Sequence, residues 1–290
     1  MALSIHLGAH KTASTHLQFS LRQIRNRLSE AGLFYADPAL LRDALPLGLA
    51  LAQGTASKAA RECRRQFEEA LATHEGLLIS EENILGGTHR TNMYSRWGTL
   101  YSTAPRRLRQ VITMAGAEPA TLYLSIRDPA SFHVSAFALQ LSAGNEIELE
   151  PYLGERDPAR VRWSGLVKRL AAVEGVSRIV VWRYEDYAAI RPELLARLVP
   201  PALLAEVPAP APRNVSVTQP GYDWYRERAM IDTQSDLRDL FQRARKKFPR
   251  EAGHPPLSLL DDKVRARSAY IYGAEIAAIR RMPGVEFLDP

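Results

Sequence analysis

The stretch that most constrains this chain is its beginning, residues 3–18, with the sequence LSIHLGAHKTASTHLQ. Alternating apolar residues at positions 3, 5 and 7 predict a short strand, Gly8 ends it, and helical periodicity begins near Ser14. A strand, a tight turn and a helix start form an anion site, because the first N–H groups of a helix have no partner within it. Lys11 adds a full positive charge. Hydroxyl donors come from Thr12, Ser14 and Thr15.

This loop differs from a Walker A motif, which requires G-x-x-x-x-G-K-[ST]. His10 stands where the second glycine would be, and the loop is shorter. The alternative interpretation is a capping cluster, in which Ser14 or Thr15 begins the helix and Lys11 is solvated.

Composition favours an anionic ligand without pointing to nucleic acid. The 38 Lys and Arg against 32 Asp and Glu give a formal charge of +6. The densest basic run, residues 243–247, lacks the interleaved aromatic residues on which single strands stack. A single cysteine, Cys63, excludes an internal disulfide and a cysteine-based zinc site. We expect neither a nucleic-acid partner nor a metal.

The sequence also lacks membrane and secretion signals. It has no apolar run of the ~20 residues that cross a bilayer, and it enters a strand at once, without a basic region followed by an apolar one. We therefore expect a soluble, cytoplasmic protein with no membrane span.

Apolar runs bounded by turn residues predict the remaining architecture. Strands are expected near residues 33–35, 77–80, 120–126 and 178–183. A single helix is expected from the anion loop to just before Gly32, and two helices are expected over residues 38–74. This alternation is typical of a three-layer α/β fold, in which helices flank a parallel β-sheet, of the P-loop-containing nucleotide-binding type. We expect a single domain over residues 1–290. Its nucleotide-binding core would span 1–216, and a helical C-terminal extension would span 217–290.

Two carboxylates follow the predicted strand at 77–80. Ligands of open α/β sheets bind outside the carboxyl ends of the strands, so Glu81 or Glu82 is expected to face the anion loop. The alternative is that either residue caps the helix that follows.

A second motif, Ile126-Arg127-Asp128-Pro129, ends the clearest strand. Asp128 with Pro129 predicts a helix start. Arg127 and Ser135, about two turns into that helix, could converge on a second phosphate. Alternatively, Arg127 pairs with a neighbouring carboxylate for structure alone.

Together the two motifs resemble the sulfotransferases that use 3′-phosphoadenosine 5′-phosphosulfate (PAPS). The resemblance covers residues 1 to about 216 and implies that the loop from Gly8 to Thr15 binds the 5′-phosphosulfate. Arg127 and Ser135 are implied to bind the 3′-phosphate. PAPS would be the co-substrate, without a metal. The family usually has glycine where this sequence has Ala13, so a positive φ there would be strained.

Two later stretches extend the resemblance. Tyr184, which follows the strand at 178–183, is implied to contact adenine. Its alternative is a packed side chain in a capping segment. Arg213 and Asn214 are similar to the family's C-terminal loop that closes over the donor, although here the two residues are adjacent.

The expected reaction is transfer of a sulfuryl group to a hydroxyl or amine by in-line displacement. Lys11 would neutralise the leaving phosphate. The family's general base is a histidine or glutamate near the sulfate. Glu82 is our first candidate and Glu81 the second, with His10 and His133 as alternatives.

The acceptor is expected to be a sugar, a polysaccharide or another small molecule. Tyr94, Trp97 and Tyr101 either line its site or form the packing face of one helix. A long amphipathic helix predicted over residues 220–249 either covers the core or forms a homodimer contact. Two alternative functions stay open: a P-loop kinase of small molecules or nucleotides, and a non-catalytic anion-binding module.

Overall fold

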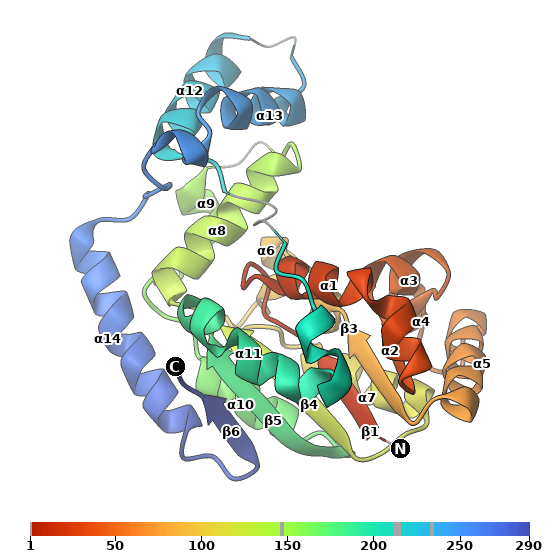
Figure 1. The fold of residues 1–290 in the computed structure, drawn as a ribbon. Helices are drawn as coiled ribbons and strands as arrows, with labels where there is room; N and C mark the ends of the chain where they lie inside the picture. The colour runs from red at the N-terminus through yellow and green to blue at the C-terminus, as the bar shows by residue number, and fades with distance from the viewer. Residues whose placement is uncertain (1, 146–147, 211–215, 233–234) are drawn as a thin grey trace.

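A computed structural model describes residues 2–145, 148–210, 216–232 and 235–290. In this part of the chain, six parallel strands form one sheet in the order β2-β3-β1-β4-β5-β6. Helices cover both of its faces (Figure 1), so the predicted three-layer α/β fold with a parallel sheet is confirmed. The strands are β1 (Ala2–His6), β2 (Leu33–Ala36), β3 (Gly76–Ser80), β4 (Ala120–Ile126), β5 (Val176–Arg183) and β6 (Val285–Leu288).

Strand β1 lies in the middle of the sheet, between β3 and β4. The chain first visits β2 and β3 on one side of β1 and then β4, β5 and β6 on the other. Such a reversal of strand order opens a crevice at the carboxyl ends of the strands, where open α/β sheets bind ligands. The loop after β1 stays attached to β4: the Leu7 N–H donates to Tyr123 O at 2.9 Å, and the Ala9 N–H donates to Ser125 O at 3.1 Å.

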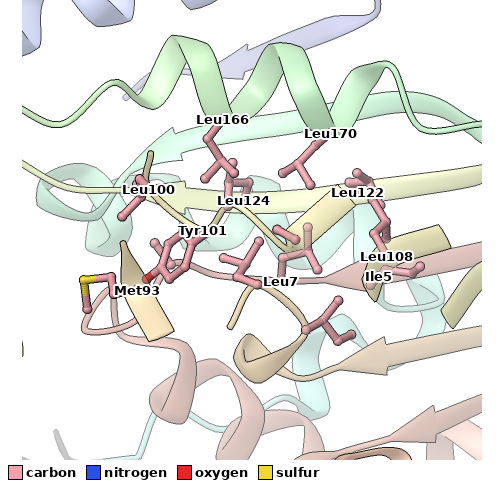
Figure 2. Packing of buried hydrophobic residues seen from close by; sticks show 14 of the residues in the cluster. Ile5, Leu7, Met93, Leu100, Tyr101, Leu108, Leu122, Leu124, Leu166 and Leu170 are labelled. Atoms are coloured by element: carbon pink, nitrogen blue, oxygen red, sulfur yellow. The ribbon is translucent and has the colours of Figure 1, made fainter. Parts of the chain in front are cut away.

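One face of the sheet carries the larger hydrophobic core. Ile5 of β1 and Leu7, which follows this strand, pack there against Leu108, Leu166 and Leu170 (Figure 2). Those side chains are fully buried, and each contributes about 2 kcal/mol by leaving water. The helices on this face are α5 (Lys58–Thr73), α7 (Ala104–Ala115) and α10 (Trp163–Ala171).

The opposite face carries a second hydrophobic cluster, which includes Leu17, Leu21, Leu28 and Leu194. The helices here are α1 (Ser14–Gln23), α2 (Arg25–Glu30) and α11 (Tyr187–Leu198). The single helix expected after the anion loop is divided at Ile24, whose φ of −110° and ψ of 19° interrupt the helix. Apolar periodicity continues across this break, so the sequence did not predict it.

Between β2 and β3 the chain forms three helices, where two were expected. Asp37 caps the first of them by accepting from the Leu40 N–H at 2.9 Å, and Pro46 separates the first from the second. Proline disfavours helical backbone in the residue before it, which accounts for the additional break. These helices are α3 (Pro38–Asp43), α4 (Leu47–Gln53) and α5.

Between β3 and β6 the described chain has further helical elements, which range from three-residue 3-10 turns to the 14-residue α8. They are η1 (Glu82–Ile84), α6 (Arg90–Met93), α8 (Pro129–Ser142), α9 (Leu149–Leu153), η2 (Tyr184–Asp186), η3 (Pro201–Glu206) and η4 (Arg250–Ala252).

The C-terminal region differs from the expected long helix. Two helices that pack on each other, α12 (Gln219–Ile231) and α13 (Leu237–Lys247), take its place, and α13 also packs on α8. Asp236 caps α13 by accepting from the Arg238 N–H. Helix α14 (Asp262–Ile279) then runs along α8 and α10 to β6, a strand in the extension that was expected to be helical (Figure 1). None of the helices in the described ranges is long and apolar enough to cross a membrane.

Candidate functional site

A cavity of about 1630 Å³ opens at the carboxyl ends of β1, β3, β4 and β5. Its walls come from the loop after β1 and from helices α1, α3, α8 and α13. Small-molecule sites usually measure about 300–1,000 Å³, so this cavity has room for two substrates at once. The sequence had placed its anion loop and its carboxylates at this edge of the sheet.

The loop from Gly8 to Ala13 follows an unusual backbone path. Three of its residues have positive φ: 45° at Gly8, 66° at Lys11 and 65° at Ala13. Alternation of left-handed and right-handed residues turns successive N–H groups toward a common point, which is how backbone nests bind anions. The Thr12 hydroxyl holds the turn by donating to Ala9 O at 2.5 Å. The strain expected for a positive φ at Ala13 is therefore present.

Helix α1 begins beyond this loop without a side-chain cap, because its N-cap residue is Ala13. The capping-cluster interpretation, with Ser14 or Thr15 as the cap, is therefore wrong. The Ser14 hydroxyl is buried, lines the cavity and has no hydrogen-bond partner among the described atoms. A buried hydroxyl without a partner costs free energy, so its position favours a ligand that would accept its hydrogen bond.

Gly8 makes the close approach of this hydroxyl possible. A Cβ at position 8 would lie 2.2 Å from Ser14 Oγ, and the φ of 45° is itself strained for any other residue. We expect Gly8→Ala to lower the free energy of unfolding by about 2 kcal/mol in denaturant titration. It should also weaken anion binding, because Ser14 must move. The control is Gly48→Ala on α4, where nothing lies within 4 Å of the new Cβ. Equal stability of the Gly8 and Gly48 variants would contradict this role.

Two cations face the cavity beside the loop. Arg127 Nη1 donates to Lys11 O at 2.7 Å, and Arg127 Nε donates to Ser131 Oγ at 2.9 Å, so this guanidinium fixes the turn. Burial lowers the pKa of Lys11 to about 8, and the positive charges of Arg127 and Arg245 add to the effect. Within the described residues, neither Lys11 nor Arg127 forms an ion pair with a carboxylate. The positive charges of Lys11 and Arg127 are therefore available to a bound anion. The alternative prediction, an ion pair between Arg127 and a neighbouring carboxylate, is not observed among the described residues.

The predicted partners of Arg127 lie on the same cavity wall. Tyr184 places its ring 4.3 Å from the Arg127 guanidinium carbon, and Ser135 is buried on α8 but lines the cavity. Asp128 caps α8 by accepting from the Ser131 N–H at 2.9 Å. The cavity therefore brings together the first loop, Arg127, Ser135 and Tyr184. Their roles toward a nucleotide stay predictions. Arg213 and Asn214 lie outside the described residues.

Of the two glutamates, only Glu82 lines the cavity. Its Oε2 accepts from Gln18 Nε2 at 2.9 Å, and an Arg42 nitrogen lies 3.6 Å from its Oε1. Burial opposes its ionisation, but the Gln18 hydrogen bond and the positive charge of Arg42 hold the pKa of Glu82 below its usual range. Glu82 is thus ionised at neutral pH.

Glu81 is committed to the structure around it. Its buried carboxylate accepts two hydrogen bonds from Arg42, at 2.9 and 2.7 Å, and a third from the Asn83 N–H at 3.0 Å. It caps the short helix η1, and it is absent from the cavity wall described here. This geometry favours the capping alternative over the role of second-choice base.

The candidate histidines are held as neutral rings. His10 lines the cavity, but its Nδ1 accepts from the Tyr101 hydroxyl at 2.8 Å and its Nε2 donates to Asn83 Oδ1 at 3.3 Å. Burial lowers the pKa of His10 and lowers that of His133 to about 4. His133 Nδ1 donates to Pro158 O at 3.1 Å while its Nε2 accepts from Tyr94. Both rings therefore have structural hydrogen bonds that a general base would have to break.

The aromatic residues considered for an acceptor surface lie elsewhere. Tyr94 and Tyr101 are buried in the core (Figure 2 shows Tyr101), and Trp97 is 82% exposed beneath the Arg96 guanidinium. None of the three is part of the described cavity wall. The structure therefore favours packing for the two tyrosines.

Sequence reasoning missed the contribution of α13 to the cavity. Phe241 and Arg245 line it from this helix, which approaches because α13 packs on α8. The basic run at 243–247 contains Arg245 but gives no sign of which of its members faces the site. Gln18, which binds Glu82, carried no signal either. No group of three or more His, Cys, Asp or Glu side chains in the described segments has the arrangement of a metal site.

Comparison with known proteins adds little. No family model matches the sequence, and no curated protein does. Among solved structures, a similar one is titled "Crystal Structure of Sulfotransferase from Alicyclobacillus acidocaldarius". It is 11% identical, the match covers 96% of this chain and 94% of that chain, and the TM-score is 0.47. A similarity of this strength is too weak to assign a function to this chain.

Proposed function

We propose that this chain is a sulfotransferase that uses PAPS and transfers its sulfuryl group to a hydroxyl or amine of a second substrate. The observation that carries the proposal is the pair of cations without carboxylate partners, Lys11 and Arg127, in a cavity that also holds the ionised carboxylate of Glu82. The choice of PAPS rests on the sequence resemblance of the two motifs.

The residues present suit an anion of this kind. The loop from Gly8 to Thr15 would hold the phosphosulfate through backbone N–H groups, Lys11 and the unpartnered Ser14 hydroxyl. Arg127 and Ser135 would hold the 3′-phosphate, and Tyr184, which lies beside Arg127 on the cavity wall, would contact the adenine. When bound, PAPS supplies an activated sulfuryl group whose acceptance leaves negative charge on a phosphate.

The chain's own part in the reaction is electrostatic and acid–base. Lys11 and the first N–H groups of α1 stabilise the negative charge that grows on the leaving phosphate. Glu82 accepts the proton that the acceptor hydroxyl or amine loses as its new bond to sulfur forms. Gln18 holds the Glu82 carboxylate in place through its 2.9 Å hydrogen bond.

A carboxylate with a low pKa is a weak base. Binding of the negatively charged donor would make Glu82 a stronger base. An anion bound near Glu82 disfavours the carboxylate form and therefore raises the pKa of Glu82 toward the working pH. Donor binding thus prepares the base in the same step that brings the sulfuryl group. The cavity's volume of about 1630 Å³ leaves space for an acceptor such as a sugar or another small hydroxyl compound.

The experiment that tests this function is calorimetric titration with 3′-phosphoadenosine 5′-phosphate, the desulfated donor, against ATP as control. We expect binding of the desulfated donor at least tenfold tighter than that of ATP, unchanged by a chelator of divalent ions. Sulfuryl transfer from PAPS to an acceptor panel should also survive the chelator. Equal affinity for ATP and the desulfated donor, or ATP turnover that depends on Mg²⁺, would contradict this proposal and indicate a kinase.

A further inference from the structure

The C-terminal helix α13 contributes side chains to the cavity that contains the anion loop. Arg245 lines the same cavity as Lys11, and its positive charge adds a smaller contribution, after burial and Arg127, to the lowered pKa of that ammonium. Phe241, one turn earlier, lines the cavity too, as residues four apart on a helix share a face. The two segments lie more than 200 residues apart in the sequence, so only the fold brings them together.

Arg245 is held in this position by its helix. Leu240, Phe241 and Ala244 are buried where α13 packs, and Arg238 Nε donates to Ala143 O, the residue that follows α8, at 2.7 Å. The backbone that carries Arg245 is therefore anchored to the helix that also carries Ser135. The packing of α13 on α8 therefore fixes the backbone position from which Arg245 reaches the cavity.

The charge of Arg245 is not neutralised. In the described part of the chain its side chain forms one long hydrogen bond, from Nη1 to Gln242 Oε1 at 3.4 Å, and that partner is neutral. Some other arginines of the cavity are paired with carboxylates, as Arg42 is with Glu81 and Arg265 with Asp262. Arg191 instead donates to Ser20 Oγ at 3.3 Å and to Pro208 O at 2.6 Å. Lys11, Arg127 and Arg245 thus line one cavity without carboxylate partners among the described residues, and the charges of both arginines act on Lys11. Like charges repel, so this arrangement favours an anion among them.

We propose that Arg245 is the third cation of the anion site, so that the C-terminal helices bind the same phosphate or sulfate group as the N-terminal loop. This inference depends on the proposed function in one respect, the identity of the anion. The ligand chemistry is a di- or polyanion with tetrahedral oxyanion groups, such as a phosphosulfate or a pyrophosphate. A guanidinium matches two oxygens of such a group at once.

The test uses inorganic pyrophosphate as the probe and the full chain in three variants. Arg245→Gln removes the charge but keeps the methylene stem, and Arg245→Lys restores a charge. The matched control is Arg243→Gln on the same helix, because Arg243 is exposed and stacks on Trp224 at 5.7 Å, away from the cavity. We expect Arg245→Gln to weaken pyrophosphate binding about tenfold, Arg245→Lys to recover part of it, and Arg243→Gln to stay within about twofold.

A second readout separates binding from a purely structural effect. Removal of a positive charge beside Lys11 raises the pKa of its ammonium, so the pH at which pyrophosphate binding is lost should move upward in Arg245→Gln. Unchanged affinity and an unchanged pH midpoint would overturn the proposal, and so would absence of pyrophosphate binding by the wild type. If binding depends on Arg245 while the desulfated donor binds no better than ATP, the proposed function fails and this inference stands.

Discussion

Replacing Lys11 by methionine should lower the affinity for 3′-phosphoadenosine 5′-phosphate about a hundredfold. Methionine keeps an unbranched apolar side chain and removes the ammonium, so the loss reports the charge. A buried charged hydrogen bond to an anion is typically worth about 3 kcal/mol, which corresponds to that factor. Calorimetry with wild type and variant measures it. The control is Lys58→Met on the exposed start of α5, away from the described cavity wall.

The pH dependence of binding should identify the same group. The pKa of Lys11 is lowered to about 8, so the ammonium is charged below that pH and neutral above it. The affinity of the wild type for the anion should therefore fall as the pH rises through about 8. A bound anion stabilises the ammonium and raises the pKa of Lys11, so the midpoint of this fall should lie somewhat higher. The Lys11→Met variant should show no such step. A step of equal size in the variant would assign the titration to another group.

Stability should change in the opposite direction to affinity. Because the folded state lowers the pKa of Lys11, the charged form is disfavoured by folding at any pH where the unfolded chain still carries the proton. Lys11→Met should thus be more stable than wild type by about 1 kcal/mol at pH 7, a figure reduced for partial exposure, and the difference should vanish above pH ~10. A less stable variant would mean that the side chain mainly packs.

The fold was largely predictable because its strands are short apolar runs with clear ends. The strand at 120–126 coincides with β4, and the expected runs at 33–35 and 77–80 lie within β2 and β3. What failed depends on tertiary context. In the described sheet β6 is an edge strand of four residues that pairs with β5, and so short a run gives little periodicity from which to predict a strand. The break at Ile24 falls within an apolar repeat that continues on both sides.

The site was predictable where a motif lies on one element and unpredictable where two distant segments meet. The anion loop follows β1 in sequence, and Arg127 follows β4, so both could be placed at the edge of the sheet. The choice between Glu81 and Glu82 depends on Arg42, which holds Glu81 and lies about 40 residues away. Arg245 reaches the cavity through the packing of α13 on α8, for which the sequence has no motif.

Replacing Glu82 by glutamine should abolish most of the transfer activity while the donor still binds. Glutamine keeps the size of the side chain and cannot take a proton, so we expect kcat to fall about a hundredfold to a thousandfold. The affinity for 3′-phosphoadenosine 5′-phosphate should be equal or slightly higher, since a negative charge has left the cavity. Turnover with an acceptor that the wild type accepts, measured beside calorimetry, gives both numbers. The acid limb of the rate profile should disappear with the carboxylate.

The neighbouring Glu81→Gln is the matched control, because it changes the same chemistry one residue away. Glu81 holds Arg42 through two hydrogen bonds and caps η1, so its loss should lower the free energy of unfolding by about 2 kcal/mol. Its kcat should stay within about threefold of wild type once the protein is folded. The reverse pattern, with activity lost in Glu81→Gln and kept in Glu82→Gln, would identify Glu81 as the general base. If both variants leave turnover unchanged, the proton goes to neither carboxylate. A wild type that binds the donor without turnover would be a binding module, indifferent to both substitutions.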